Sequence, residues 1–300
     1  MKLQQIKALV AIDQCGSIQE ASEILHVTQP ALSRSIKELE RLLGVCLLKR
    51  SYKGMSLTDE GKRLIRHAQL AVESVKRLQT EAENITEATV GEITIGVTSL
   101  TAVIDGVDVC ISQFQEKYPR MKIRLVELRP GQILHRLRDG SLDFALTSQQ
   151  NAMRLNLDWD PVGQIRGRVF CHKDNPLRHV HSLRQLQHAK WVSLDEADNA
   201  SSQFFQMFES NDVHLPQSII ECSSIVLAIR MVIRSGAFIT LSELGQLGNF
   251  PDRLDKHIVQ VSVAESIPDY PILLVCIDRN ALTTPARELL LNLKRVLRDR

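Results

Sequence analysis

The sequence predicts a multi-domain α/β protein in three parts. Residues 1–58 have the apolar spacing of short helices followed by a β-ribbon, and residues 59–90 have that of one long helix. From residue 91 to residue 300, alternating apolar segments typical of strands are separated by helical segments. The length of 300 residues also favours more than one domain.

The composition excludes several classes of protein. Apolar residues make up 44% of the chain and charged residues 24%, which favours a packed core over global disorder. No apolar run approaches the roughly 20 residues that cross a bilayer, and the first residues lack the pattern of a signal peptide. Aromatic residues, at 4%, are too few for a single-strand binder that stacks bases. We therefore expect a soluble, cytoplasmic chain without a membrane partner.

The charge is unevenly distributed. The formal net charge is only +2, and residues 91–300 hold equal numbers of acidic and basic side chains. Residues 29–58, however, hold six basic and two acidic side chains. A local basic surface suits a polyanion, because contacts with phosphates release counterions. The alternative is a solvated helix face with incidental lysines.

Apolar residues at helical spacing predict three helices before Gly44. Gly16 ends the first helix, and Ser17 with Glu20 has the form of a capping box at the start of the second. A tight turn follows, and Thr28 is placed to cap the third helix. A short helix, a turn and a second helix make a helix-turn-helix.

The third helix is polar at its N-terminal end and apolar on its opposite face. In helix-turn-helix proteins this end enters the major groove, where Gln pairs with adenine and Arg with guanine. Gln29 and Arg34 have those side chains. Residues 45–58 then read as a β-ribbon with a basic tip, which is a wing suited to backbone or minor-groove contact. The alternative for this segment is an ordinary surface hairpin.

Residues 21–40, which read ASEILHVTQPALSRSIKELE, closely resemble the signature of LysR-type transcriptional regulators. Residues 57–61, LTDEG, resemble the segment that closes the wing in that family. The resemblance implies a sequence-specific DNA-binding regulator, not an enzyme, whose activity a small-molecule effector modulates. The residues that we expect to contact double-stranded promoter DNA are Ser17, Thr28, Gln29, Pro30, Ser33, Arg34, Lys37, Arg50 and Lys53.

The long helix has a heptad seam. No Pro or Gly occurs between Lys62 and Val90, and apolar residues alternate four and three positions apart, which drives helix pairing. The seam consists of Leu64, Ala68, Ala71, Val75, Leu78, Ala82 and Ile85. The alternative is an amphipathic helix packed on its own domain. The resemblance implies a homodimer, usually a homotetramer, and RNA polymerase as a further partner.

In residues 91–300, the resemblance implies an effector domain of two α/β lobes, similar to periplasmic binding proteins. The first lobe uses about residues 91–161 and 267–300, and the second about 162–266. The strands expected are 92–97, 121–128, 142–146, 169–171, 191–193, 219–220, 237–239 and 272–276. The helices expected are 103–118, 133–139, 182–187, 201–210, 224–234 and 285–297.

The effector is expected beyond the carboxyl ends of the strands, where helix N-termini offer free amides. Hydroxyl and amide groups there suit a carboxylate or a similarly polar small molecule. Each hydroxyl has simple helix capping as its alternative role. The candidate effector residues, carried over from the family, are Ser99, Leu100, Thr101, Arg129, Thr147, Phe204 and Ser224.

The sequence contains no motif for catalysis, nucleotide binding or metal binding. The chain lacks a glycine-rich nucleotide loop, a GxSxG elbow and an HExxH helix. Cys171 and four nearby histidines match no standard zinc spacing, so we interpret these histidines as surface or loop residues. Six scattered cysteines without a CxxC pair indicate no disulfide framework. We expect no metal and no cofactor. The alternative function is a small-molecule sensor whose N-terminal helices do not bind DNA.

Overall fold

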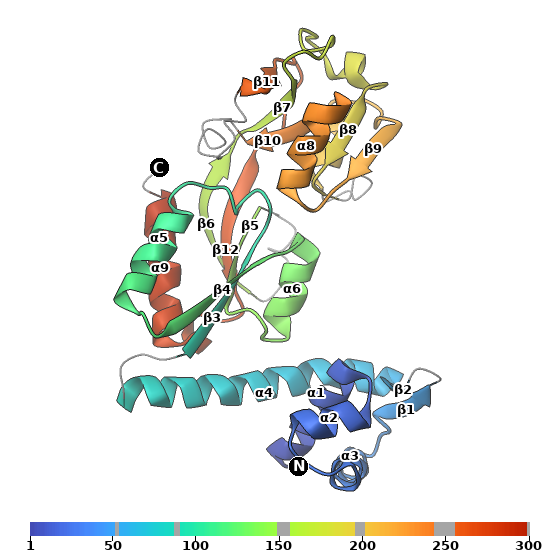
Figure 1. Ribbon diagram of the computed structural model, residues 1–300, viewed down its shortest axis with the longest axis vertical. Coiled ribbons are helices and arrows are strands. Elements are labelled where there is room, and N and C mark those ends of the chain that lie inside the picture. Colours follow the sequence, from blue (N-terminus) through green and yellow to red (C-terminus); the bar gives the residue numbers. More distant parts are fainter. Residues whose placement is uncertain (52–53, 87–90, 149–156, 196–201, 243–255, 299–300) are drawn as a thin grey trace. The chain divides into compact units, whose positions relative to one another are not determined.

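A computed structural model describes residues 1–51, 54–86, 91–148, 157–195, 202–242 and 256–298. The chain forms two compact units. One contains residues 1–88 with 135–141, and the other contains residues 89–134 with 142–300. Figure 1 gives the elements of both units in chain order.

The N-terminal unit is helical with one β-ribbon, as predicted (Figure 1). The ribbon strands pair antiparallel, with Leu48 opposite Leu57. Its elements are α1 (Leu3–Cys15), α2 (Ile18–Ile24), α3 (Gln29–Leu43), β1 (Leu48–Ser51), β2 (Gly54–Leu57) and α4 (Asp59–Thr86).

The helix ends agree with the predicted caps, with one exception. Gly16 ends α1 in the left-handed conformation at φ 66°, and the Thr28 hydroxyl accepts a hydrogen bond from the Ala31 amide at the start of α3. The capping box at Ser17 is wrong. Ser17 has the extended backbone of an N-cap, but its hydroxyl accepts no cap hydrogen bond, and the residue lines the groove beside α3 and the ribbon.

The core of this unit joins α1, α3 and the beginning of α4. Leu9, Ile12 and Leu39 are buried together with Ile65 of α4. The seam residues Leu64 and Ala68 pack against this core, whereas Leu78 is 69% exposed. The first turns of α4 therefore pack on their own domain, and the seam is open to a partner only further along the helix.

The second unit contains two five-stranded sheets. In the first sheet, with order β4-β3-β5-β12-β6, β3 runs parallel to β4 and β5, while β12 runs antiparallel to β5 and β6. Its strands are β3 (Gly91–Val97), β4 (Met121–Glu127), β5 (Phe144–Thr147), β6 (Asp158–Ile165) and β12 (Tyr270–Cys276). Its helices are α5 (Val107–Lys117), α6 (Pro130–Arg138), η5 (Arg279–Ala281) and α9 (Thr284–Arg298).

The second sheet has the order β11-β7-β10-β8-β9, and β8 runs parallel to β9 and β10. Its strands are β7 (Gly167–His172), β8 (Lys190–Ser193), β9 (Ser218–Glu221), β10 (Phe238–Ser242) and β11 (Ile258–Val261). Its helices are η2 (Leu183–Leu186), α7 (Gln203–Glu209) and α8 (Ile225–Ser235). Trp191 lies at the centre of an aromatic cluster in the core beside this sheet.

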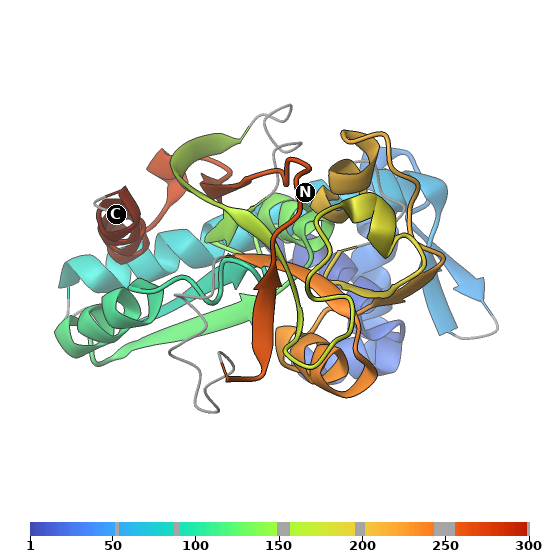
Figure 2. The same ribbon diagram turned by 90° about the horizontal axis from the view of Figure 1, so that it is seen from above.

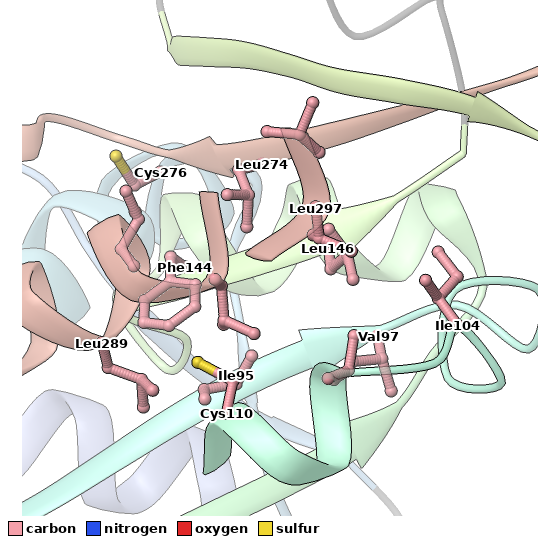
Figure 3. Packing of buried hydrophobic residues seen from close by; sticks show 14 of the residues in the cluster. Ile95, Val97, Ile104, Cys110, Phe144, Leu146, Leu274, Cys276, Leu289 and Leu297 are labelled. Carbon is pink, nitrogen blue, oxygen red and sulfur yellow. The ribbon is translucent and has the colours of Figure 1, made fainter. Parts of the chain in front are cut away.

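The chain returns to the first sheet after completing the second. α9 packs beside α5, with the Lys117 ammonium 2.7 Å from a carboxylate oxygen of Glu288 (Figure 1, Figure 2). Figure 3 shows Leu274 of β12 and Leu289 of α9 packing with Phe144 of β5. Strand β12 and helix α9 therefore contribute to the first core.

Some element boundaries differ from those expected. The first sheet extends to Ile165, a little beyond the end of about 161 expected for the first lobe, because β6 continues through Pro161 at the edge of the sheet. β6 and β11 were not expected at all, and η2 is a short 3₁₀ helix. α5 begins at Val107 rather than 103, because Gly106 takes a left-handed conformation at φ 84° and turns precede it.

No helix in the described ranges is both long and apolar enough to span a membrane.

Candidate functional site

The N-terminal half of α3 presents a polar face. Leu32 and Ile36 are buried in the core, whereas Gln29, Arg34 and Lys37 are exposed. Thr28, Pro30 and Arg50 are also exposed, and Ser33 is half-buried. Lys53 lies outside the described residues.

A groove of about 540 Å³ runs between α2, α3 and the ribbon. Ser17, Gln29, Pro30, Ser33 and Arg50, all predicted to contact DNA, line it together. Its other lining residues are Ile18, Gln19, Gly54 and Met55. The lining thus contains hydroxyl and amide groups, one guanidinium and no carboxylate, which suits the phosphates and base edges of a nucleic acid.

Glu40 is one of only two acidic residues in the basic segment, and its carboxylate fixes the base of the ribbon. One of its oxygens accepts from the backbone amides of Leu47 at 2.8 Å and Leu48 at 3.2 Å. This carboxylate is therefore occupied within the domain, where two amide dipoles stabilise it. No local sequence pattern indicates this contact.

The ribbon is also held at its tip against the end of α1. The Met55 amide donates to the Gly16 carbonyl oxygen at 2.8 Å. Gly54 has φ 121°, and a Cβ there would lie 2.5 Å from the same carbonyl oxygen. Only glycine allows this close approach, so the sequence Gly54-Met55 sets where Arg50, on the paired strand, meets the groove.

A second cavity, of about 500 Å³, lies between the two sheets of the second unit. Its lining comes from segments that follow the carboxyl ends of β3, β4, β5, β8 and β9, the place where open α/β sheets bind ligands. The lining residues are Thr98, Ser99, Leu100, Glu127, Leu128, Arg129, Pro130, Gln132, Ser148, Leu194, Asp195, Ser223 and Ser224.

Ser99 joins the two sheets across this cavity. Its Oγ lies 2.5 Å from Oε1 of Glu127 and 3.1 Å from the carbonyl oxygen of Ser223. Ser224 caps α8, since its hydroxyl accepts from the Leu227 amide at 3.4 Å. The capping role does not remove Ser224 from the cavity, because the residue still lines it.

Of the seven effector candidates, Ser99, Leu100, Arg129 and Ser224 line the cavity. Thr101 does not, because it is fully buried and its hydroxyl bonds within the turn and with the Leu146 carbonyl oxygen at 2.8 Å. Thr147 is buried behind the cavity, and its hydroxyl has no hydrogen-bond partner among the described residues.

Phe204 is the third candidate that the structure removes from the cavity. Its ring packs edge-on against Trp191, with the ring centres 5.6 Å apart, and also against Phe208. It is 2% exposed, so its role is core packing beside the second sheet. Ser201, which was expected to open the same helix, lies outside the described residues.

Nine lining residues were not among the candidates: Thr98, Glu127, Leu128, Pro130, Gln132, Ser148, Leu194, Asp195 and Ser223. Glu127 is the last residue of β4, and Asp195 follows β8 by two residues. Their position at strand ends could have indicated them, but the expected site was based on hydroxyl and amide groups and not on carboxylates. The cavity therefore carries two carboxylates and one guanidinium rather than an overall positive charge.

Within the described ranges, no three His, Cys, Asp or Glu side chains come together to hold a metal ion. Cys171, which the sequence placed near several histidines, is fully buried. Burial raises the pKa of its thiol to about 11, with Arg178 opposing weakly. At neutral pH this thiol is therefore protonated and unreactive.

Comparison with known proteins identifies both units. Residues 3–62 match the family described as bacterial regulatory helix-turn-helix protein, lysR family, and residues 86–298 match the LysR substrate binding domain. The HTH-type transcriptional regulator TdcA of Escherichia coli (strain K12) is 24% identical over 268 residues, covering 89% of this chain and 84% of its own.

Solved structures share the fold. CbnR, a LysR family transcriptional regulator, aligns with a TM-score of 0.67 and 16% identity over 99% of both chains. Full-length CbnR complexed with its target DNA also aligns with a TM-score of 0.67, at 17% identity, over 100% of this chain and 99% of that one. Since the two family models together match most of the sequence, the chain belongs to the LysR family of DNA-binding transcriptional regulators, with a substrate-binding domain after its helix-turn-helix.

Proposed function

We propose that this regulator reads promoter DNA with the groove between α3 and the ribbon, and that a small molecule in the cavity between the two sheets modulates this binding. The observation that carries the proposal is the groove lining. Five residues selected from sequence for DNA contact line one groove that has a guanidinium and no carboxylate.

Each exposed side chain has a distinct proposed role. Gln29 and Arg34, at the N-terminal end of α3, read base edges in the major groove, with Gln pairing to adenine and Arg to guanine. Lys37 and Arg50 bind phosphates and set the orientation of the domain. Ser17 and Ser33 add hydroxyl contacts, and Lys53, which comes between the two ribbon strands in the sequence, contacts the DNA backbone.

The proposed binding unit is a homodimer that pairs through α4, assembled further into a homotetramer, with one half-site for each winged domain. The exposed Leu78 supports this pairing, because an isolated helix gains nothing from an apolar side chain in water. Ala71 and Val75 continue the same seam, and the side chain of Ile85 lies outside the description. A protein that acts on promoter DNA and RNA polymerase in this way works in the cytoplasm.

The effector acts by binding one pose of the two lobes better than another. A ligand in the cavity contacts segments from both sheets, so its binding energy differs between more open and more closed poses. That difference limits how far it shifts DNA binding. The proposal assigns no catalytic step to this chain.

Gel-shift titration of the full chain tests the proposal. We expect selective binding to fragments of the promoter that it controls, weakening steeply as salt rises. Equal affinity for random competitor DNA would contradict it and favour the alternative, a sensor that does not bind DNA. The variant Arg50→Ala should weaken binding to all sequences, and Arg120→Ala, on an exposed turn of the second unit, is the matched control.

A further inference from the structure

The cavity between the two sheets has more hydrogen-bond acceptors than donors around Ser99. A serine hydroxyl has one hydrogen. Two acceptors lie within hydrogen-bond distance of Ser99 Oγ: Glu127 Oε1 at 2.5 Å and the Ser223 carbonyl oxygen at 3.1 Å. One of the two therefore lacks this hydrogen at any moment, and a donor supplied by a ligand would satisfy both.

The electrostatics of the lining point the same way. Glu127 is the carboxylate nearest to this cluster, and Asp195 brings a second carboxylate from the other sheet. No ion pair to Glu127 is found among the described residues. A carboxylate ligand placed here would meet like charge, which costs binding energy wherever water is excluded.

A further polar group is placed to hold a ligand. Ser148, which follows β5, is 8% exposed and lines the cavity. Within the described part of the chain, its hydroxyl makes no hydrogen bond. This hydroxyl is therefore available to donate to, or accept from, a ligand or water in the cavity. The cavity is thus built for a polar molecule, and Glu127 decides its charge.

We propose that the effector carries a protonated amine, which binds Glu127 of the first lobe and the Ser223 carbonyl oxygen of the second. This inference rests on the proposed function and specifies its ligand class. An ammonium group has three donors and no acceptor, so it satisfies the carboxylate, the carbonyl and the lone pairs of Ser99 Oγ together. Because its partners come from both lobes, it favours their closed pose.

The inference differs from the expectation drawn from sequence. Hydroxyls and helix N-termini at the strand ends favour a carboxylate, and Glu127 was not among the candidates. Glu127 gives an amine, or an amino acid with both groups, a counter-ion beside Ser99, whereas a simple carboxylic acid has only Arg129 of the lining as its counter-ion.

A matched probe panel tests the ligand class. Amino acids are compared with the deaminated acid and the decarboxylated amine of the same carbon skeleton, by thermal shift and then calorimetry on the full chain. We expect compounds with an amine to bind and their deaminated acids not to bind. E127Q should weaken the binding of amine compounds by about tenfold or more, because it removes the charge of the side chain and keeps its shape. E116Q, at an exposed carboxylate on α5, should change nothing.

Three results would overturn the inference: deaminated acids that bind as tightly as their parents, E127Q that binds the amines as well as the unmodified chain does, or no binding by any amine. Gel shifts of the same samples separate this from the larger proposal. The unmodified chain without ligand should bind DNA selectively whether or not an amine binds in the cavity, and this readout does not involve the E127Q variant. Loss of selective DNA binding by the unmodified chain would instead count against the proposed function.

Discussion

The groove beside α3 and the cavity between the two sheets are built from similar polar groups but differ in charge. Both are lined by serine hydroxyls, with two glutamine amides in the groove and one in the cavity. The groove adds Arg50 and no carboxylate, whereas the cavity adds Glu127 and Asp195 against Arg129. A hydroxyl can donate to an anion or accept from a cation, so the few charged groups determine which ligand charge each site favours. We therefore expect phosphates in the groove and an ammonium in the cavity.

The two sites also differ in how their residues come together. The groove uses residues from a segment of about 40 positions, held by local turns and by the contact of Gly54 with Gly16. The cavity combines strand ends from residue 98 to residue 224, brought together by two sheets. A substitution in one site should therefore leave the other intact, and the predictions below test that separation.

The largest expected effect is on assembly. Ala71→Asp places a charge in the α4 seam, where the partner helix would bury it. We expect dimers to disperse and DNA affinity to fall by about 10²–10⁴-fold, because simultaneous binding of two half-sites is lost. Effector binding should persist. Light scattering that finds an intact oligomer would count against this prediction. Ser74→Asp, exposed and off the seam, is the control.

The next effect concerns base reading. Arg34→Ala should lower affinity for the preferred site by about 10- to 100-fold and relax the preference at one position, since an Arg–guanine pair contributes about 1–3 kcal/mol. Lys37→Ala should weaken binding to all DNA sequences alike. It should also reduce the slope of log affinity against log salt concentration by about one. Gel shifts with single-base variants measure both. If Arg34→Ala leaves the base preference unchanged, Arg34 does not read a base.

A smaller effect is expected in the cavity. Ser99→Ala removes the hydroxyl between Glu127 and the Ser223 carbonyl, a loss of about 1 kcal/mol, or about fivefold in effector affinity. Operator binding without effector should not change. Calorimetry that finds the same effector affinity would refute the assignment of Ser99. Thr101→Ser is a useful contrast, because it keeps the buried hydroxyl and should leave effector affinity unaltered.

The smallest expected effect is the pH dependence of stability, to which Glu288 and Asp13 contribute with opposite signs. Partial burial raises the pKa of Glu288, but hydrogen bonds from Lys117 and Tyr118 outweigh it and lower that pKa overall. Its contribution to stability is therefore present above its ordinary value near 4.5 and is lost as pH falls through the lowered pKa. Burial raises the pKa of Asp13, whose contribution is present below 3.8 and is lost as pH rises through the raised pKa.

Acid should thus weaken the effector domain through the protonation of Glu288. Both tryptophans, Trp159 and Trp191, lie in the effector domain, so their fluorescence follows that domain alone. We expect the urea concentration at the midpoint of unfolding, followed by tryptophan fluorescence, to decrease as the pH is lowered from about 5 to about 3. Carboxyl groups titrate in this range. Glu288→Gln should reduce this fall. A midpoint that does not change with pH would contradict the role of Glu288.

Sequence patterns predicted the elements whose signals are local. The turn at Gly16 and the cap at Thr28 are both present. β6 was missed because Asp158, Asp160 and Pro161 break the apolar alternation of an edge strand. In the structure, the Asp160 carboxylate lies 2.8 Å from both Lys294 and Arg279, partners more than 100 residues away that no local pattern reveals.

By itself, the sequence determined the DNA-reading unit, its basic surface, the long helix and the α/β class of the remainder, because helix caps, periodicity and charge act over a few neighbouring residues. The tertiary structure alone decided which strand-end residues share the cavity. Thr101 and Ser99 are two positions apart, yet one hydroxyl is buried in a turn and the other bridges two sheets. Side-chain direction after a strand depends on the packing of distant segments, and so does the meeting of Ser99, Glu127 and Ser223 that sets the charge of the ligand.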